Sequence, residues 1–153
     1  MRQYIKTCIE IEKTIARIYR IFQDSSQFDT ELRRIFFALA NDEDDHARQL
    51  EFAMRIPSES FVPEHDIPPL QAEALLSKAE ALHQKVSSIA LSPIQAVDLG
   101  IELESDFCSI HLSNSVRFKE ESMRKMFAAM ARSEDTHKAQ LQKIKVRLDL
   151  PRS

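Results

Sequence analysis

Apolar residues recur at helical spacing along almost the whole 153-residue chain, and this pattern predicts an all-α protein. The predicted helices cover residues 3–23, 29–55, 70–90, 93–117 and 120–148. Prolines at positions 57, 63, 68 and 69 predict a loop over residues 56–69, because proline interrupts a continuous helix. Asp29 or Thr30 can cap the second helix, and Ser92 followed by Pro93 marks the start of the fourth.

An internal repeat divides the chain into two halves. Residues 32–50 align without gaps on residues 123–141 with nine identical positions, and residues 9–12 match residues 101–104. The repeat predicts two helical hairpins, one in each half, within a single domain of residues 1–153. The helix over residues 70–90 would lie in the crossover between them. Its 21 residues rise roughly 30 Å, which is enough to carry the chain back along a bundle.

Carboxylates and imidazoles interrupt the apolar stripes near the middle of the four repeated helices. Two Glu-x-x-His sequences place a carboxylate and an imidazole on one helix face, since residues i and i+3 are neighbours there. A single glutamate precedes each of them and continues its own apolar stripe, whereas Glu10 and Glu102 fall outside the stripes and face water. The six candidate metal ligands are therefore Glu12, Glu43, His46, Glu104, Glu134 and His137.

Four ionised carboxylates in a helical core would be very costly without compensation. Two divalent cations would neutralise their four negative charges, and two neutral imidazoles would complete the ligand set. Carboxylate and imidazole ligands suit two iron ions, with manganese or zinc as alternatives. The alternative interpretation is that both Glu-x-x-His sequences lie on solvated helix faces. Their occurrence in a duplicated context, each with a glutamate in the stripe upstream, favours the metal site.

The remaining composition limits the other classes of function. The net charge of −3 comes from acids and bases that are mixed along the chain, so no nucleic-acid partner is expected. No apolar run reaches the roughly 18 residues of a membrane span, and the N-terminus becomes charged too early for a signal peptide. We therefore expect no membrane association and a cytoplasmic location. Two cysteines and no Cys-x-x-Cys sequence exclude a disulfide framework and a rubredoxin-type site.

These ligands, in this order on four helices with a crossover, resemble the ferritin-like superfamily, and most closely its rubrerythrin-like members. The resemblance covers almost the whole chain, and Glu12 with Tyr19 seven residues later is similar to the first-helix motif of that family. It implies a ferritin-like four-helix bundle. The chain departs from full rubrerythrins in lacking the rubredoxin module and a candidate for their extra glutamate. In the latter respect the ligand set is similar to that of bacterioferritin.

The resemblance implies a di-iron oxidoreductase that acts on peroxide or dioxygen and oxidises ferrous iron. Without a rubredoxin module, electrons would come from a separate donor protein, and a homodimer is the expected assembly. Two other functions stay open: a non-catalytic module that binds, stores or senses iron, and a helical scaffold whose site is empty or holds a structural ion.

Several further residues have two interpretations. Tyr19 either donates a hydrogen bond to a ligand carboxylate or is an ordinary packed tyrosine. His111 occupies the matching position in the second half, where it is an additional ligand, a partner of a ligand, or a hydrogen-bonded core histidine. Asp44 and Asp135 recur in both halves, and each either orients a histidine or is solvated.

The cysteines form a second open question. Cys8 lies four residues before Glu12, and Cys108 lies four residues after Glu104. In antiparallel helices these offsets would bring both thiols to one level beside the site. They would then either pair under oxidation or serve as small buried apolar residues.

Overall fold

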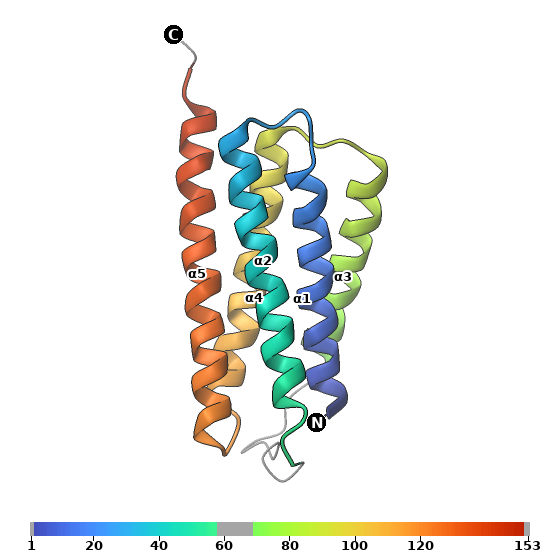
Figure 1. The fold of residues 1–153 in the computed structure, drawn as a ribbon, viewed down its shortest axis with the longest axis vertical. Coiled ribbons are helices and arrows are strands. Elements are labelled where there is room, and N and C mark those ends of the chain that lie inside the picture. Colours follow the sequence, from blue (N-terminus) through green and yellow to red (C-terminus); the bar gives the residue numbers. More distant parts are fainter. Residues whose placement is uncertain (1, 58–68, 152–153) are drawn as a thin grey trace.

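The computed structural model describes residues 2–57 and 69–151, and within these ranges the chain forms a bundle of five α-helices (Figure 1). The helices are α1 (Arg2–Gln23), α2 (Thr30–Ala53), α3 (Pro69–Ser88), α4 (Pro93–Ser115) and α5 (Glu121–Asp149). The all-α prediction is confirmed, and every predicted helix end lies within two residues of the observed one. Of the predicted loop, residues 58–68 lie outside the described residues, and Pro69 already belongs to α3.

Local capping explains where two of the helices begin. The side chain of Asp29, and not that of Thr30, accepts a hydrogen bond from the Leu32 amide at 2.8 Å. Ser92 and Gln95 form a reciprocal capping box at the start of α4, and Pro93 follows as the first helical residue. These caps satisfy backbone amides that have no partner inside the helix.

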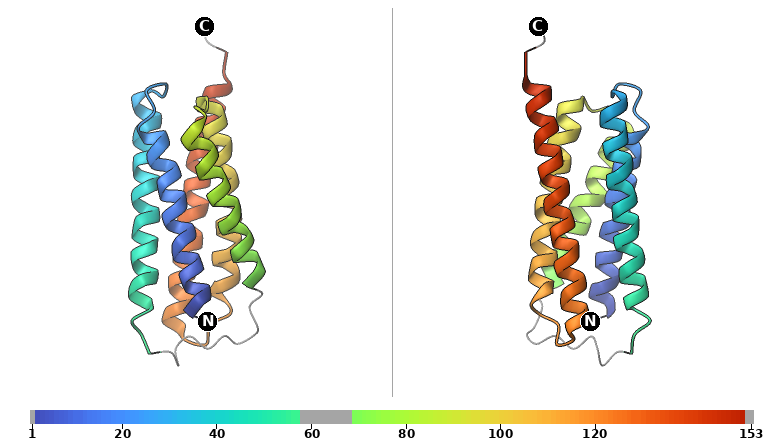
Figure 2. Two further views of the ribbon diagram at one scale, coloured as in Figure 1. Left: turned by 90° about the vertical axis from the view of Figure 1, so that its right-hand side faces the viewer. Right: turned by 60° about the vertical axis from the view of Figure 1, so that its left-hand side comes forward.

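The helices are arranged so that the two halves of the chain face each other. Figure 1 shows α1 and α5 running in one direction, and α2 and α4 running in the other. The helix α1 packs on α2, and α4 packs on α5. The helix α3 lies beside α1 and α4 and returns the chain from the end of α2 to the start of α4 (Figure 2).

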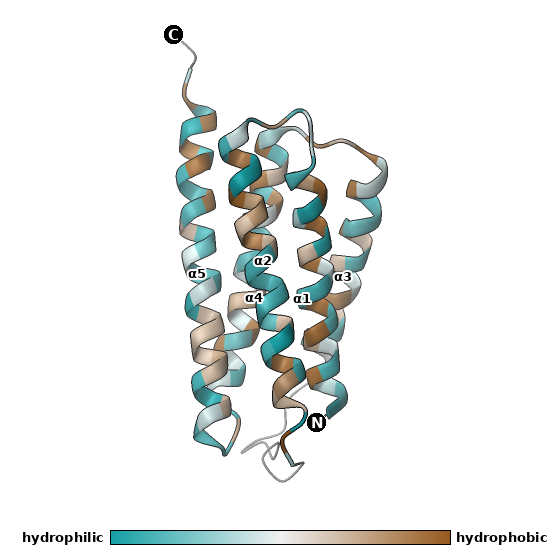
Figure 3. Cartoon of the chain, viewed as in Figure 1, coloured by the Kyte–Doolittle hydropathy of each residue, from teal (hydrophilic) through white to brown (hydrophobic). Residues whose placement is uncertain are grey.

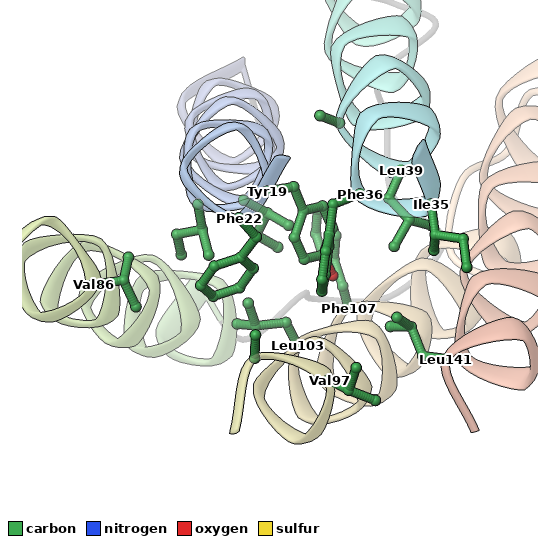
Figure 4. Packing of buried hydrophobic residues seen from close by; sticks show 14 of the residues in the cluster. Tyr19, Phe22, Ile35, Phe36, Leu39, Val86, Val97, Leu103, Phe107 and Leu141 are labelled. Carbon is green, nitrogen blue, oxygen red and sulfur yellow. The ribbon is translucent and has the colours of Figure 1, made fainter. Parts of the chain in front are cut away.

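The apolar core consists of two clusters. Hydrophobic and hydrophilic positions alternate around each helix (Figure 3), and the hydrophobic ones pack inward. The larger cluster includes Tyr19, Phe22 and Phe36, and the ring centroids of Tyr19 and Phe36 are 5.6 Å apart (Figure 4). The smaller cluster includes Leu50 and Phe127. Along α1, α2 and α5, the predicted ligands lie between residues of one cluster and residues of the other, so a polar layer separates the two clusters.

Candidate metal centre

The polar layer is formed by the six residues that the sequence singled out. They come from four helices: Glu12 from α1, Glu43 and His46 from α2, Glu104 from α4, and Glu134 and His137 from α5. The four carboxylates are at most 1% exposed, and the two histidines keep 5% and 4%. These groups are buried because each continues the apolar face of its helix.

The six side chains form two overlapping sets of possible ligands. One set is Glu12, Glu43, His46 and Glu134, and the other is Glu43, Glu104, Glu134 and His137. In each set, one nitrogen or oxygen atom from every residue lies within 4.8 Å of the others. Glu43 and Glu134 belong to both sets, so they would be shared if both sets held an ion. Each set also has a glutamate and a histidine of its own.

Both histidines direct Nδ1 toward the carboxylates. His46 Nδ1 lies 3.0 Å from Glu134 Oε1, 3.5 Å from Glu43 Oε2 and 3.7 Å from Glu12 Oε2. His137 Nδ1 lies 3.4 Å from Glu43 Oε1, 3.4 Å from Glu104 Oε2 and 3.8 Å from Glu134 Oε2. The imidazoles stack at a centroid distance of 6.4 Å. The two histidines therefore occupy equivalent places on the two sides of the shared glutamates.

Many of these converging atoms have no hydrogen-bond partner among the described residues. They are Glu12 Oε2, Glu43 Oε1 and Oε2, His46 Nδ1, Glu104 Oε2, Glu134 Oε1 and His137 Nδ1. Buried polar atoms are nearly always hydrogen-bonded in proteins, because an unpaired one costs about 1–3 kcal/mol. Converging carboxylate oxygens and imidazole nitrogens are an arrangement that a cation can satisfy. The residues of these two sets could therefore hold metal ions.

Electrostatics divides the carboxylates into two kinds. Burial, followed by the charge of Glu43, raises the pKa of Glu12, and burial with the charge of Glu134 raises the pKa of Glu104. Burial also acts to raise the pKa of Glu43 and Glu134. Their close partners, which for Glu43 are above all the two histidines, nevertheless bring the pKa of both glutamates below the usual range. The shared glutamates therefore hold their charge more strongly than the two unshared ones.

The histidines respond to the same charges in the opposite sense. Burial alone would lower the pKa of His46 and His137, but the adjoining carboxylates raise the pKa of both well above the usual value. Without metal, each imidazole is thus able to hold a proton opposite the shared glutamates. Metal ions and protons compete for the same lone pairs.

The unshared glutamates each form a hydrogen bond with a residue from the opposite half of the chain. Tyr19, which is fully buried, donates its hydroxyl to Glu104 Oε1 at 2.6 Å. Burial, followed by the charge of Glu104, raises the pKa of Tyr19 and keeps the phenol protonated. The matching residue His111 places Nε2 3.0 Å from Glu12 Oε1 and 4.0 Å from Glu134 Oε1. His111 belongs to neither set of converging atoms, and its contact is with the ligand carboxylate.

Asp42 is a functional candidate that the sequence reasoning missed. Its Oδ2 lies 2.8 Å from Nε2 of His137, on the side of the ring opposite to the carboxylates. Of the two interpretations of Asp44 and Asp135, the structure favours the solvated one, since Asp44 pairs with Arg20 at 2.9 Å and Asp135 is exposed. The only signal in the sequence is that Asp42 directly precedes Glu43. Its contact comes from the packing of α2 on α5, which helical periodicity does not reveal.

The two cysteines are both free and have different surroundings. Cys8 is fully buried and belongs to the smaller apolar cluster. Cys108 is half-buried and directs Sγ to the Ala131 carbonyl at 3.4 Å. Cys8 thus fits the interpretation as a small buried apolar residue, and pairing of the two thiols under oxidation stays the alternative hypothesis.

Comparisons of the chain with protein families, with curated proteins and with solved structures find no match. None of the described helices is long and apolar enough to cross a membrane. What the chain shows by itself is an all-helical bundle of five helices around a buried cluster of glutamates and histidines that could hold metal ions.

Proposed function

We propose that this protein is a di-metal carboxylate protein of the ferritin-like, rubrerythrin-like type, which binds two iron ions and oxidises them with peroxide or dioxygen. The observation that carries the proposal is the convergence of four buried carboxylates and two imidazoles, most of whose facing atoms make no hydrogen bond within the described residues. Such a layer in the middle of an apolar bundle is a large cost for a scaffold. Two divalent ions remove that cost.

The donor set supports iron as the metal. All the donors are carboxylate oxygens or imidazole nitrogens, and no thiolate belongs to either set. Oxygen-rich sites with imidazole suit iron and manganese, and zinc is a further alternative. Two bound ferrous ions would supply two electrons to one oxidant. The two ligand sets share Glu43 and Glu134, and this sharing holds both ions at one small region of the bundle.

The site lies in the interior of the bundle, where few of its atoms contact solvent. The four carboxylates are buried almost completely, and the side chains of His46 on α2 and His137 on α5 are only slightly exposed to solvent. A small oxidant such as dioxygen or peroxide suits a site that is buried to this degree. The apolar clusters on both sides of the polar layer exclude water. Tyr19 and His111 position Glu104 and Glu12 by hydrogen bonds.

Anaerobic loading with ferrous iron, followed by peroxide or air, tests the proposal. We expect two ferrous ions per chain by elemental analysis, and their rapid oxidation when the oxidant is added. Repeated turnover with an added electron donor supports the oxidoreductase. Slow oxidation with growth of a mineral would instead indicate iron storage.

Variants locate the activity in the chain. The double variant Glu43→Ala/His46→Ala should lose iron uptake, because it removes one shared and one unshared ligand. The control variant Glu10→Ala alters an exposed glutamate on α1, only two residues from Glu12, and should bind iron as the wild type does. Undiminished uptake by the double variant would show that iron binds elsewhere.

A further inference from the structure

The two ligand sets differ in what supports their histidines. In one set, Nε2 of His137 faces the Asp42 carboxylate at 2.8 Å, and the Ser133 hydroxyl lies 3.5 Å away. A carboxylate only accepts hydrogen bonds, so Nε2 of His137 carries a hydrogen and donates a hydrogen bond to Asp42. Nδ1 is then the ring nitrogen that faces Glu43, Glu104 and Glu134, where its lone pair would be used by a bound metal ion.

His46 lacks the corresponding support. Across the described residues, every contact of its ring nitrogens that the structure shows is made by Nδ1 with Glu12, Glu43 and Glu134. No carboxylate lies against its Nε2 in these ranges. The ring therefore has no acceptor of the kind that fixes the tautomer of His137.

The internal repeat explains the difference. With the offset of 91 residues that relates His46 to His137, Asp42 corresponds to Ser133. An exact repeat would place a second aspartate where it could reach His46, but the chain has a serine there. The asymmetry thus coincides with one of the positions at which the two halves differ.

The unshared glutamates do not compensate for this difference. Glu104 accepts one hydrogen bond from Tyr19, and Glu12 has one with His111. Each set therefore has one hydrogen-bond partner on its own glutamate, and the two shared glutamates belong to both sets. Within residues 2–57 and 69–151, the Asp42 carboxylate is the charged group outside the two sets that contacts a ligand of one set alone.

We infer that the two metal positions are unequal, and that the position of Glu104 and His137 binds its ion first because Asp42 supports His137. A carboxylate that accepts the second N–H of a metal-binding imidazole raises its basicity and fixes its orientation, and losing such a partner typically lowers metal affinity about 10–100-fold. This inference rests on the proposed function, since it assigns an order of filling to that site.

Titration with Zn²⁺, followed by NMR of the imidazole nitrogens, tests the order. Zinc serves as the probe because it is redox-inactive and has no geometric preference of its own. We expect the signals of His137 to change during the first equivalent and those of His46 during the second. Simultaneous changes, or changes of His46 first, would overturn the inference and leave the two-metal site intact. If neither histidine responds, the proposed function falls as well.

The variant Asp42→Asn tests the cause of the order. It keeps the size of the side chain but removes the charge from the acceptor, so the tighter of the two affinities should fall about 10–100-fold in calorimetric titration with Zn²⁺. Asp44→Asn is the matched control, because Asp44 lies on the same helix but pairs with Arg20. An unchanged tighter affinity in Asp42→Asn would contradict the assigned role of Asp42.

A double exchange provides a second test. In Asp42→Ser/Ser133→Asp the chain keeps its composition and charge, while the carboxylate moves to the opposite half. The order of the histidine signals should then reverse, with His46 responding during the first equivalent of Zn²⁺. An unchanged order in this variant would show that the asymmetry has another origin.

Discussion

The hydroxyl of Tyr19 donates a 2.6 Å hydrogen bond to the carboxylate of Glu104, which lies 85 residues further along the chain. This bond joins α1 to α4 and therefore links the two halves of the internal repeat. Both groups are buried, so neither has water as an alternative partner. The bond leaves Oε2 of Glu104 directed to the candidate metal centre without a hydrogen bond.

Replacement of this tyrosine by phenylalanine should affect both stability and metal binding. In Tyr19→Phe, Glu104 Oε1 loses its donor, and we expect the free energy of unfolding to fall by about 1–3 kcal/mol in urea denaturation of the metal-free protein. Removal of a partner of a ligand should also weaken binding of one ion about 10–100-fold.

The variant Tyr4→Phe is the matched control for this prediction. Tyr4 donates to Asn114 Oδ1 at 2.7 Å, and neither residue is a candidate ligand. We expect a loss of stability without a change in metal affinity. Equal metal affinities in the two variants would show that the bond of Tyr19 serves packing alone.

The sharing of Glu43 predicts a difference in stoichiometry between two glutamate variants. Glu43 belongs to both ligand sets, whereas Glu104 belongs to one. We expect Glu43→Ala to bind neither ion tightly and Glu104→Ala to retain one. Equilibrium dialysis followed by elemental analysis measures the ions per chain. Retention of two ions by Glu43→Ala would rule out its bridging position.

The cysteines should differ in their reaction with alkylating reagents. Burial, followed by the charge of Glu12, raises the pKa of Cys8 from 9.0 to about 12, so its thiol stays protonated near neutral pH. Because only the thiolate is nucleophilic, Cys8 should react at pH 8 only after unfolding. The half-buried Cys108 should react in the native protein. Mass spectrometry of the alkylated peptides identifies the modified residue, and Cys108→Ser should abolish the fast reaction.

The same shift affects stability at alkaline pH. The pKa of Cys8 is higher in the folded protein than in the unfolded chain, so its contribution is fully present below about pH 9 and is lost as the pH rises toward 12. We expect the free energy of unfolding to fall over this interval, and to fall less in Cys8→Ala. Equal slopes in the two proteins would place the alkaline loss elsewhere.

Most of the fold and the ligand set follow from local patterns. Helical spacing located the five helices, and continuity with the apolar stripe separated Glu12 from the exposed Glu10. Asp42 could not be found in this way, because its partner His137 lies on another helix, 95 residues away. The interpretations of His111 could be separated only by its contact on α4 with Glu12 on α1. Periodicity shows which face of a helix is buried, but not which residues meet across the bundle.

The charged layer gives the interior two separate apolar regions instead of one. Each apolar region can exclude water by itself. The candidate ligands between the two regions hold the helices together when cations balance the charges of the glutamates. We expect amide hydrogen exchange of the metal-free protein to reveal two groups of slowly exchanging amides with different opening free energies, one for each region. Bound ions would connect all four helices that carry the layer, so both groups should then open together. The cations would thus set how far the chain unfolds as a single cooperative unit.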